Sequence, residues 1–360
     1  MKNNLLLYNL KGIARMLTPE LLLPKNREKL LQGVAERKDI EYIKSRVEYY
    51  CQLQAPVRLD SSAWELRDLR FTRKKSVYFF DSYEFARYFP QDFRAHFEFG
   101  DVNYICPKPS ITKSRPIQAR LESRALSHPT HLRAQDSKRA DTHALDFLNS
   151  AESSADSTTP PLPPFANSTL LNLEKNRHFI FINDPYSFES KRDILFYRGG
   201  IYQDHRTRFF EKYFNHPLCD LGHTGSKSVH HAWQKEKISI KKHLPYKFLL
   251  SLEGNDVASN LKWVMSSNSL AVMPEPKFET WFMEGRLLPD VHYLRIAEDY
   301  ANLEECIESC LRDEGLAREI IHNAHEYVKQ FFDKEREAII SLLVLEKYFY
   351  YTGQIDKLRI

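Results

Sequence analysis

The sequence predicts an α/β protein with two domains, one of which contains a nucleotide-binding βαβ unit. Residues 246–252 are an apolar run, 253–256 a turn with Gly254, 257–265 a predicted helix, and 270–273 a second apolar run. This strand–turn–helix–strand order is that of a nucleotide-binding half-domain. A chain of 360 residues, 42% hydrophobic and 28% charged, is long enough for two domains with substantial cores.

The elements before this unit are predicted in chain order. Residues 1–55 are mostly helical, because their apolar positions recur at a spacing of three to four. Apolar runs predict strands over 76–80, 100–105, 178–183 and 193–200. Residues 119–167 are rich in Ser, Ala, Thr, Arg, Asp and Pro, which predicts a mostly disordered surface insertion. Its arginines and lysines suggest a membrane or partner contact, but the intervening acids favour a solvated loop.

The remaining elements are helical. Residues 206–214 are predicted as a helix between the strand at 193–200 and the βαβ unit. After that unit, amphipathic patterns predict helices over 302–310 and 316–332, and a last helix over about 334–350.

Composition excludes several classes of function. The five cysteines are odd in number, and their spacing suggests neither a disulfide framework nor a zinc site. No apolar run approaches the roughly 20 residues that span a bilayer. The net charge of +4 comes without a basic stripe typical of nucleic-acid binding, although it suits anionic partners. We expect a protein of the reducing cytoplasm with no structural metal and no nucleic-acid partner.

Two glycine turns are candidate phosphate sites. Gly254 lies where a strand meets a predicted helix, and the N–H groups at a helix N-terminus bind anions. Gly199-Gly200 follows another strand and is flanked by Arg198 and Arg206, whose guanidinium groups suit phosphate oxygens. A diphosphate would fit between the two turns; the alternative for each is an ordinary turn. Neither a G-x-G-x-x-G nor a P-loop motif is present, which argues against a dinucleotide oxidoreductase and a P-loop kinase.

Other charged residues have both functional and structural interpretations. Asp81 follows a predicted strand, where α/β proteins place chemistry, but it would equally cap a helix. Glu279 begins a predicted helix, where it would accept the hydroxyls of a ribose or act as a favourable first-turn acid. Lys113 and Arg115 form a basic pair in a loop, suited either to an anionic ligand or to solvent.

These segments resemble glycosyltransferase family 90, which includes bacterial lipopolysaccharide glycosyltransferases, fungal capsule proteins and animal protein O-glucosyltransferases. The resemblance covers most of the chain outside 119–167 and is strongest over 246–332. The matching pieces are Tyr246-Lys247-Phe248-Leu249, Gly254, Asn268-Ser269-Leu270, Leu288-Pro289, His292-Tyr293 and Asp299, with Phe196-Tyr197-Arg198-Gly199-Gly200, Arg206, Tyr78-Phe79-Phe80-Asp81, Lys113, Asn323-Ala324, Tyr327 and Phe331.

The resemblance implies a GT-B-like fold, in which two Rossmann-like domains face each other across a cleft. Residues 1–185 would form the acceptor-side domain, 186–332 the nucleotide-sugar-binding domain, and 333–360 a helix packing back toward the first domain. It also implies inversion at the anomeric carbon without an essential metal or other cofactor. Asp81 would be the general base, with Lys113 and Arg115 on the acceptor side. The donor-binding residues would be Arg198, Gly199, Gly200, Arg206, Gly254, Asn255, Asp256, Val257, Ala258, Asn260, Lys262 and Glu279.

Two departures from the family pattern concern the donor. Gly200 stands where the animal enzymes have a serine, and Asn260 stands near the position of their arginine. Lys262 is a nearby candidate to supply the missing charge.

The expected function is therefore transfer of a hexose or pentose from a UDP-sugar to a lipopolysaccharide or lipooligosaccharide. The enzyme would work in the bacterial cytoplasm, at the inner face of the inner membrane. The alternative is a catalytically impaired sugar-nucleotide-binding or scaffold protein of the same fold; a more distant one is a teichoic acid or capsule polymer transferase.

Overall fold

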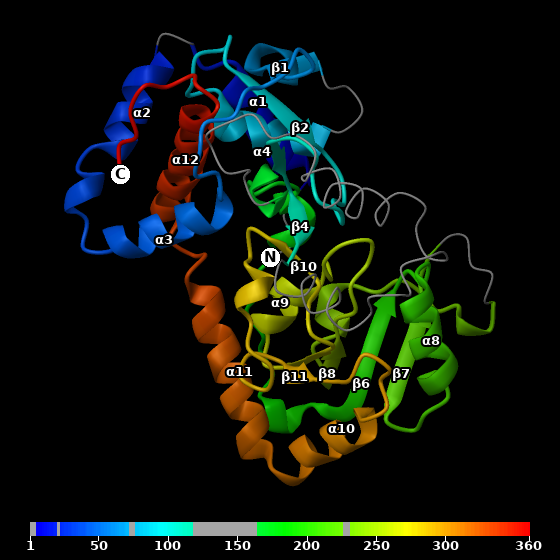
Figure 1. Ribbon diagram of the computed structural model, residues 1–360. Coiled ribbons are helices and arrows are strands. Elements are labelled where there is room, and N and C mark those ends of the chain that lie inside the picture. The colour runs from blue at the N-terminus through cyan, green and yellow to red at the C-terminus, as the bar shows by residue number, and fades with distance from the viewer. Residues whose placement is uncertain (1–4, 20–21, 72–75, 118–163, 226–230) are drawn as a thin grey trace. The chain divides into compact units, whose positions relative to one another are not determined.

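The computed structural model describes residues 5–19, 22–71, 76–117, 164–225 and 231–360 (Figure 1). The chain divides into two compact units, which are described separately below. The sheet unit consists of Arg177–Pro276 and Met283–Phe332. The helical unit consists of Asn3–Asn176, Lys277–Phe282 and Asp333–Ile360. The last helix thus clusters with the N-terminal residues, and so does the short segment Lys277–Phe282 from within the range expected for the donor domain.

The sheet unit is built on a five-stranded parallel sheet in the order β11-β9-β8-β6-β7. Its strands are β6 (Arg192–Gly199), β7 (Cys219–His223), β8 (Tyr246–Leu250), β9 (Leu270–Met273) and β11 (Leu294–Arg295). Its main helices are α8 (Asp204–Tyr213), α9 (Leu261–Met265), α10 (Leu303–Arg312) and α11 (Glu314–Lys329). The chain begins the sheet at β6, adds β7 on one side and then β8, β9 and β11 on the other. The predicted α/β class is confirmed in this unit, and the order reverses between β6 and β8.

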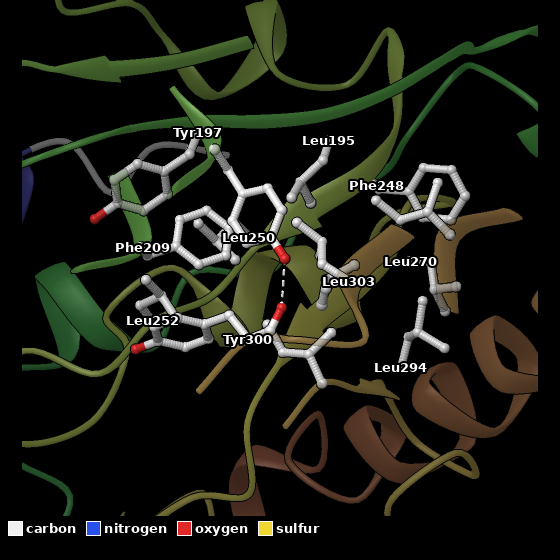
Figure 2. Close-up of a cluster of buried hydrophobic side chains, with 14 of the residues drawn as sticks. Leu195, Tyr197, Phe209, Phe248, Leu250, Leu252, Leu270, Leu294, Tyr300 and Leu303 are labelled. Carbon is white, nitrogen blue, oxygen red and sulfur yellow. Dashed lines mark hydrogen bonds between the residues drawn. The ribbon is translucent and has the colours of Figure 1, made fainter. Parts of the chain in front are cut away.

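One face of this sheet carries the core (Figure 2). Successive side chains of a strand point to opposite faces, so Leu195 and Tyr197 of β6 lie on the same face as Phe248 and Leu250 of β8. The core cluster also contains Phe209 of α8. Phe196 and Arg198 of β6 therefore point to the opposite face.

The helical unit contains α1 (Leu5–Met16), α2 (Leu23–Leu31), α3 (Ile40–Tyr50), α4 (Ser76–Ala86), α7 (Lys175–His178, ending in the sheet unit) and α12 (Lys334–Tyr351). Helix α12 packs on α3 and α4. The buried Arg46 of α3 pairs with Glu337 of α12 and donates to the hydroxyl of Tyr50. Because breaking a buried ion pair leaves an uncompensated charge, this contact strongly favours the packing of α12 on α3.

Short strands complete the helical unit. A four-stranded sheet has the order β1-β2-β3-β5, with β1 (Trp64–Glu65) antiparallel to β2 (Arg94–Glu98), and β3 (Ser110–Thr112) and β5 (Ser168–Leu170) continuing in parallel. A separate antiparallel pair joins β4 (Ser114–Pro116) to β10 (Phe278–Thr280). No helix lies between β2 and β3, so this part of the described chain lacks the strand–helix alternation of a Rossmann domain.

Several predicted elements agree with the structure. The helices expected in 1–55, near 206–214 and beyond 302 are present, as are the strands at 193–200, 246–252 and 270–273. Most of the predicted insertion, 119–163, lies outside the described residues, whereas Pro164–Asn167 form a short 3-10 helix. None of the described helices has both the length and the apolar character to cross a membrane.

Five predictions are wrong. Residues 76–80 belong to helix α4, because the buried Phe79, Tyr83 and Ala86 are spaced at helical intervals and a short apolar run fits either structure. Residues 100–105 and 179–183 form no regular element. The helix expected from residue 257 begins at Leu261, and Glu279 lies in strand β10 instead of a helix.

Candidate functional site

A pocket of about 120 Å³ opens in the sheet unit where the strand order reverses. In open parallel sheets, ligands bind near the carboxyl ends of the strands at such a reversal. The pocket is lined by Phe196, Tyr197, Arg198, Gly199, Gly200, Arg206, His243, Leu249, Ser259, Asn260 and Trp263. It therefore brings together the Gly199-Gly200 turn, both flanking arginines and Asn260.

Arg198 is fixed in the wall of the pocket. Its guanidinium group lies 4.2 Å from the ring centroid of Phe196 and pairs with the Asp220 carboxylate at 2.7 Å. It also donates to the backbone carbonyls of Tyr197 and Asp220, each at 2.9 Å. Arg198 is thus preorganised, and Asp220 offsets part of its charge.

Arg206 of α8 connects the two predicted glycine turns. Its Nη1 donates to the carbonyl of Gly200 at 2.7 Å, while Nε and Nη2 donate to the carbonyls of Glu253 and Leu252 at 2.8 Å. A Cβ atom on Gly254 would lie 3.5 Å from Nη2. One side chain therefore holds the chain after β6 against the chain after β8.

The Gly254 turn does not form the predicted helix N-terminus. Its backbone N–H donates to the carbonyl of Asp256 at 2.8 Å, and Asn255 accepts a hydrogen bond from Gln203 at 3.0 Å. Helix α9 begins only at Leu261 and has five residues. The expected helix N-terminus at Gly254 is therefore wrong, whereas the donor-binding role of Gly254 stays a prediction. The turn lies beside the guanidinium group of Arg206.

The residues predicted beyond that turn divide into two groups. Asn260 lines the pocket, and its amide donates to the carbonyl of Leu250 at 2.9 Å. Val257 and Ala258 are buried core residues that do not line it. Lys262 is fully buried and paired with Glu284, so the expectation that it supplies charge to the donor is not supported by its position.

Glu279 and Arg115 form a buried ion pair in the helical unit. They face each other across β4 and β10, with Nε 2.8 Å from Oε1. Arg115 also donates to the carbonyls of Tyr49 and Ser168, and Tyr49 donates to Glu279. The two charges predicted to meet a ligand separately are satisfied by each other, which favours a structural role.

Lys113 lies in the bend between β3 and β4 of the helical unit, as the predicted loop position implies, but it is buried. Its ammonium group lies 2.5 Å from Asp101 and 3.3 Å from Glu174. Glu174 also accepts from the hydroxyl of Tyr78 at 3.2 Å and has a φ of 58°, a left-handed value that non-glycine residues rarely adopt. No motif marks Asp101 or Glu174, so sequence reasoning missed both.

Asp81 is fully buried within α4, and its predicted place at the end of a strand is wrong. One carboxylate oxygen accepts from the hydroxyl of Tyr8 at 2.8 Å and the other from the backbone N–H of Lys175 at 3.0 Å. Burial raises the pKa of Asp81 to about 6, although the nearby Lys175 ammonium opposes this change. The residue joins α1 and α7 to α4.

His243 lines the pocket, although no motif in the sequence marks it as a site residue. Its ring lies edge-on between Phe196 and Trp263, at centroid distances of 5.1 and 5.4 Å. Nδ1 is 3.0 Å from the carbonyl of Ser239, which requires the proton on Nδ1. Burial lowers the pKa of His243, so the ring is neutral near pH 7.

The described residues contain no group of three or more His, Cys, Asp or Glu able to hold a metal ion.

Comparison with known proteins agrees on one family. The model of glycosyl transferase family 90 matches residues 182–349, a range that includes the whole pocket lining. The chain is 38% identical over 308 residues to the O-glucosyltransferase LpsA of Dichelobacter nodosus, covering 85% of this chain and 82% of that protein. It is 27% identical over 154 residues to the O-glucosyltransferase rumi homolog of Aedes aegypti, covering 40% of this chain and 38% of the relative.

Proposed function

The chain belongs to glycosyltransferase family 90, and from this premise we propose that it transfers glucose from UDP-glucose to a lipopolysaccharide or lipooligosaccharide acceptor. The relative with 38% identity is named an O-glucosyltransferase, which supports glucose over other hexoses and pentoses. The acceptor is the one expected from the family's bacterial members. The GT-B arrangement of a donor domain and an acceptor domain, and a site of action at the inner face of the inner membrane, are part of the proposal.

The observation that best supports this proposal is the pocket at the ends of β6 and β8. Gly199 and Gly200 add no side chains of their own to the pocket wall, and the hydroxyl of Tyr197 and the ring of Tyr202 take up the space where their Cβ atoms would be. A diphosphate would meet the backbone of this turn beside these two side chains. Arg206 donates its hydrogen bonds to neutral carbonyls, which leaves its positive charge to attract an anion. Arg198 adds a second fixed guanidinium group in the same wall.

The proposed reaction is an inverting transfer. The acceptor hydroxyl oxygen forms a bond to C1 of glucose as the bond from C1 to the UDP oxygen breaks, and a base takes the hydroxyl proton. Charge develops on the departing diphosphate, where Arg198 and Arg206 would stabilise it electrostatically without a metal. Because both arginines are held by hydrogen bonds before the ligand arrives, little reorganisation is needed in the transition state.

The choice of base depends on access. A general base must come within about 2.6–3.2 Å of the proton it takes. Asp81, the base expected from sequence, is fully buried with both oxygens engaged. Asp101 of the same unit is partly exposed, with 28% of its side chain accessible, and is held by Lys113. Asp101 therefore fits the role better, and Asp81→Asn and Asp101→Asn separate the two assignments.

The test is UDP release by the purified chain with truncated lipopolysaccharide acceptors. We expect release with UDP-glucose and less with UDP-galactose or UDP-xylose, unchanged by a chelator, and a product of inverted anomeric configuration. Asp101→Asn should abolish turnover and keep UDP affinity, whereas Asp81→Asn should keep turnover at a temperature where it stays folded.

A different outcome would favour the alternative. UDP binding without turnover of any donor and acceptor would identify a sugar-nucleotide-binding or scaffold protein. The departures at Gly200 and Asn260 are the sequence features that agree with that alternative.

A further inference from the structure

Helix α1 turns its polar and small side chains toward the protein. Tyr8 donates to the carbonyl of Val77 at 3.0 Å and to Asp81 at 2.8 Å. Gly12 is buried against the ring of Phe80, where a Cβ atom would come within 2.5 Å of a ring carbon. Arg15 pairs with Glu84 at 2.5 Å. Hydrogen bonds, an ion pair and one glycine contact thus hold α1 on α4.

The opposite face of α1 is apolar and exposed. Leu6, Leu10, Ile13 and Leu17 recur at a spacing of three to four, and they are 67%, 54%, 49% and 77% exposed. Leu7 and Met16 are exposed beside them. Among the described residues, six of the thirteen exposed large hydrophobic side chains lie between Leu6 and Leu17. Amphipathic helices of globular proteins normally turn this stripe toward the core, so α1 is oriented the opposite way.

The charge around this apolar stripe is basic. The first 19 residues of the sequence contain Lys2, Lys11 and Arg15 and no Asp or Glu. Lys11 is exposed on α1, and the following helix, α2, exposes Lys25, Lys29 and one acid, Glu28, which pairs with Arg359. An apolar face with flanking lysines is complementary to an anionic lipid surface, in which the leucines enter the acyl boundary and the ammonium groups meet phosphates.

The size of the stripe argues against a second copy of the chain as its occupant. A helix of 12 residues is about 18 Å long, so a stripe about 10 Å wide covers roughly 200 Å². A stable protein interface buries about 800 Å² on each partner. A bilayer needs no complementary groove and accepts a row of single side chains on a convex helix.

We propose that α1 lies in the surface of an anionic bilayer, with Leu6, Leu10, Ile13 and Leu17 inserted and Lys11 at the headgroups. This goes beyond the proposed reaction, since it assigns the expected membrane contact to a defined surface that binds lipid with or without donor and acceptor. The hydrogen bond from Tyr8 to the buried Asp81 holds the lipid-facing helix α1 on α4. We infer that this is the structural role of Asp81.

The experiment is co-sedimentation of the full chain with vesicles of phosphatidylcholine alone or mixed with phosphatidylglycerol. A Leu6→Gln/Leu10→Gln/Leu17→Gln variant is compared with a matched control, Leu288→Gln/Val291→Gln/Phe332→Gln, which removes three exposed apolar side chains from the sheet unit. We expect the α1 variant to bind mixed vesicles more weakly by on the order of tenfold or more, and the control to bind as the parent does. Salt should weaken binding by the parent.

Three results would overturn the proposal. One is equal binding by the α1 variant and its control while circular dichroism and thermal unfolding show both folded. Another is binding to neutral and anionic vesicles alike without an effect of salt. The third is a change of molecular mass of the α1 variant in light scattering without lipid, which would identify a second copy as the occupant. None of these readouts depends on sugar transfer, so failure here is distinct from failure of the proposed reaction.

Discussion

Replacing Arg206 with leucine tests whether one side chain holds the donor pocket together. The substitution removes three hydrogen bonds, to the carbonyls of Gly200, Leu252 and Glu253, and keeps much of the apolar stem. If each hydrogen bond contributes about 1 kcal/mol, losing all three lowers the free energy of unfolding by about 3 kcal/mol. Because Arg206 is partly exposed, water can hydrogen-bond to the three carbonyls that lose their donor. We therefore expect the free energy of unfolding to decrease by about 2 kcal/mol.

The expected loss can be measured by thermal unfolding and by UDP binding. A loss of about 2 kcal/mol in a unit of this size lowers Tm by about 4–8 °C. Arg208→Leu is the matched control, since Arg208 is exposed on the same helix and its replacement should stay within about 0.5 kcal/mol. Arg206→Leu should also weaken UDP binding, both by loosening the two turns and by removing a positive charge.

Arg206→Lys separates these two contributions. Lysine keeps the charge but lacks the planar fork that reaches three carbonyls. We expect it to recover part of the UDP affinity and little of the stability. If Arg206→Leu unfolds at the same temperature as Arg208→Leu, the connecting role is wrong, whatever happens to UDP binding.

Two further predictions concern burial. Asp81 has a folded pKa of about 6 against 3.8 in the unfolded chain, so its contribution to stability is fully present below about pH 4 and is lost as the pH rises through 6. Denaturant unfolding at about pH 4 and pH 7 should therefore show the parent losing about 2 kcal/mol more than Asp81→Asn between these pH values, and equal losses would contradict the burial argument. Gly199→Ala should lower Tm more than Gly200→Ala. The new Cβ atom at position 199 would lie 2.3 Å from the hydroxyl of the buried Tyr197, whereas the one at position 200 would lie 2.5 Å from the ring of Tyr202, which is exposed and can move. Equal Tm values for the two variants would show that Tyr197 moves as readily as Tyr202.

The local sequence pattern predicts three of the five strands of the sheet unit, and it misses β7 and β11. Strands β6, β8 and β9 are short apolar runs bounded by turn residues, and both of their faces are covered, so sequence and burial agree. The long amphipathic helices after residue 302 have one apolar face each and were equally clear. The run at 76–80 failed because it is too short to separate a buried strand from one side of a helix.

The site was harder to predict because its geometry depends on long-range pairing. The sequence predicts Glu279 as an acid in the first turn of a helix, but its carboxylate pairs with Arg115, which is 164 residues away in the chain. Lys113 meets Glu174 across 61 residues, much of them outside the described chain. Which residues form such ion pairs depends on the register of the strands and on the packing of segments far apart in the chain. A short stretch of sequence contains no information about either.

Charge compensation explains which basic residues remain suited to a ligand. The sequence offered five cations for anionic groups, and four of them pair with carboxylates: Lys113 with Asp101 and Glu174, Arg115 with Glu279, Arg198 with Asp220, and Lys262 with Glu284. A cation beside a carboxylate presents a weaker net field to a neighbouring anion than an unopposed cation does, since the two charges oppose each other at short range. Arg206 differs because its hydrogen bonds end on three neutral carbonyls, so its geometry is fixed while its charge remains. We therefore propose Arg206 as the principal electrostatic contact for the diphosphate of the proposed donor, because its geometry is fixed without a carboxylate partner among the described residues.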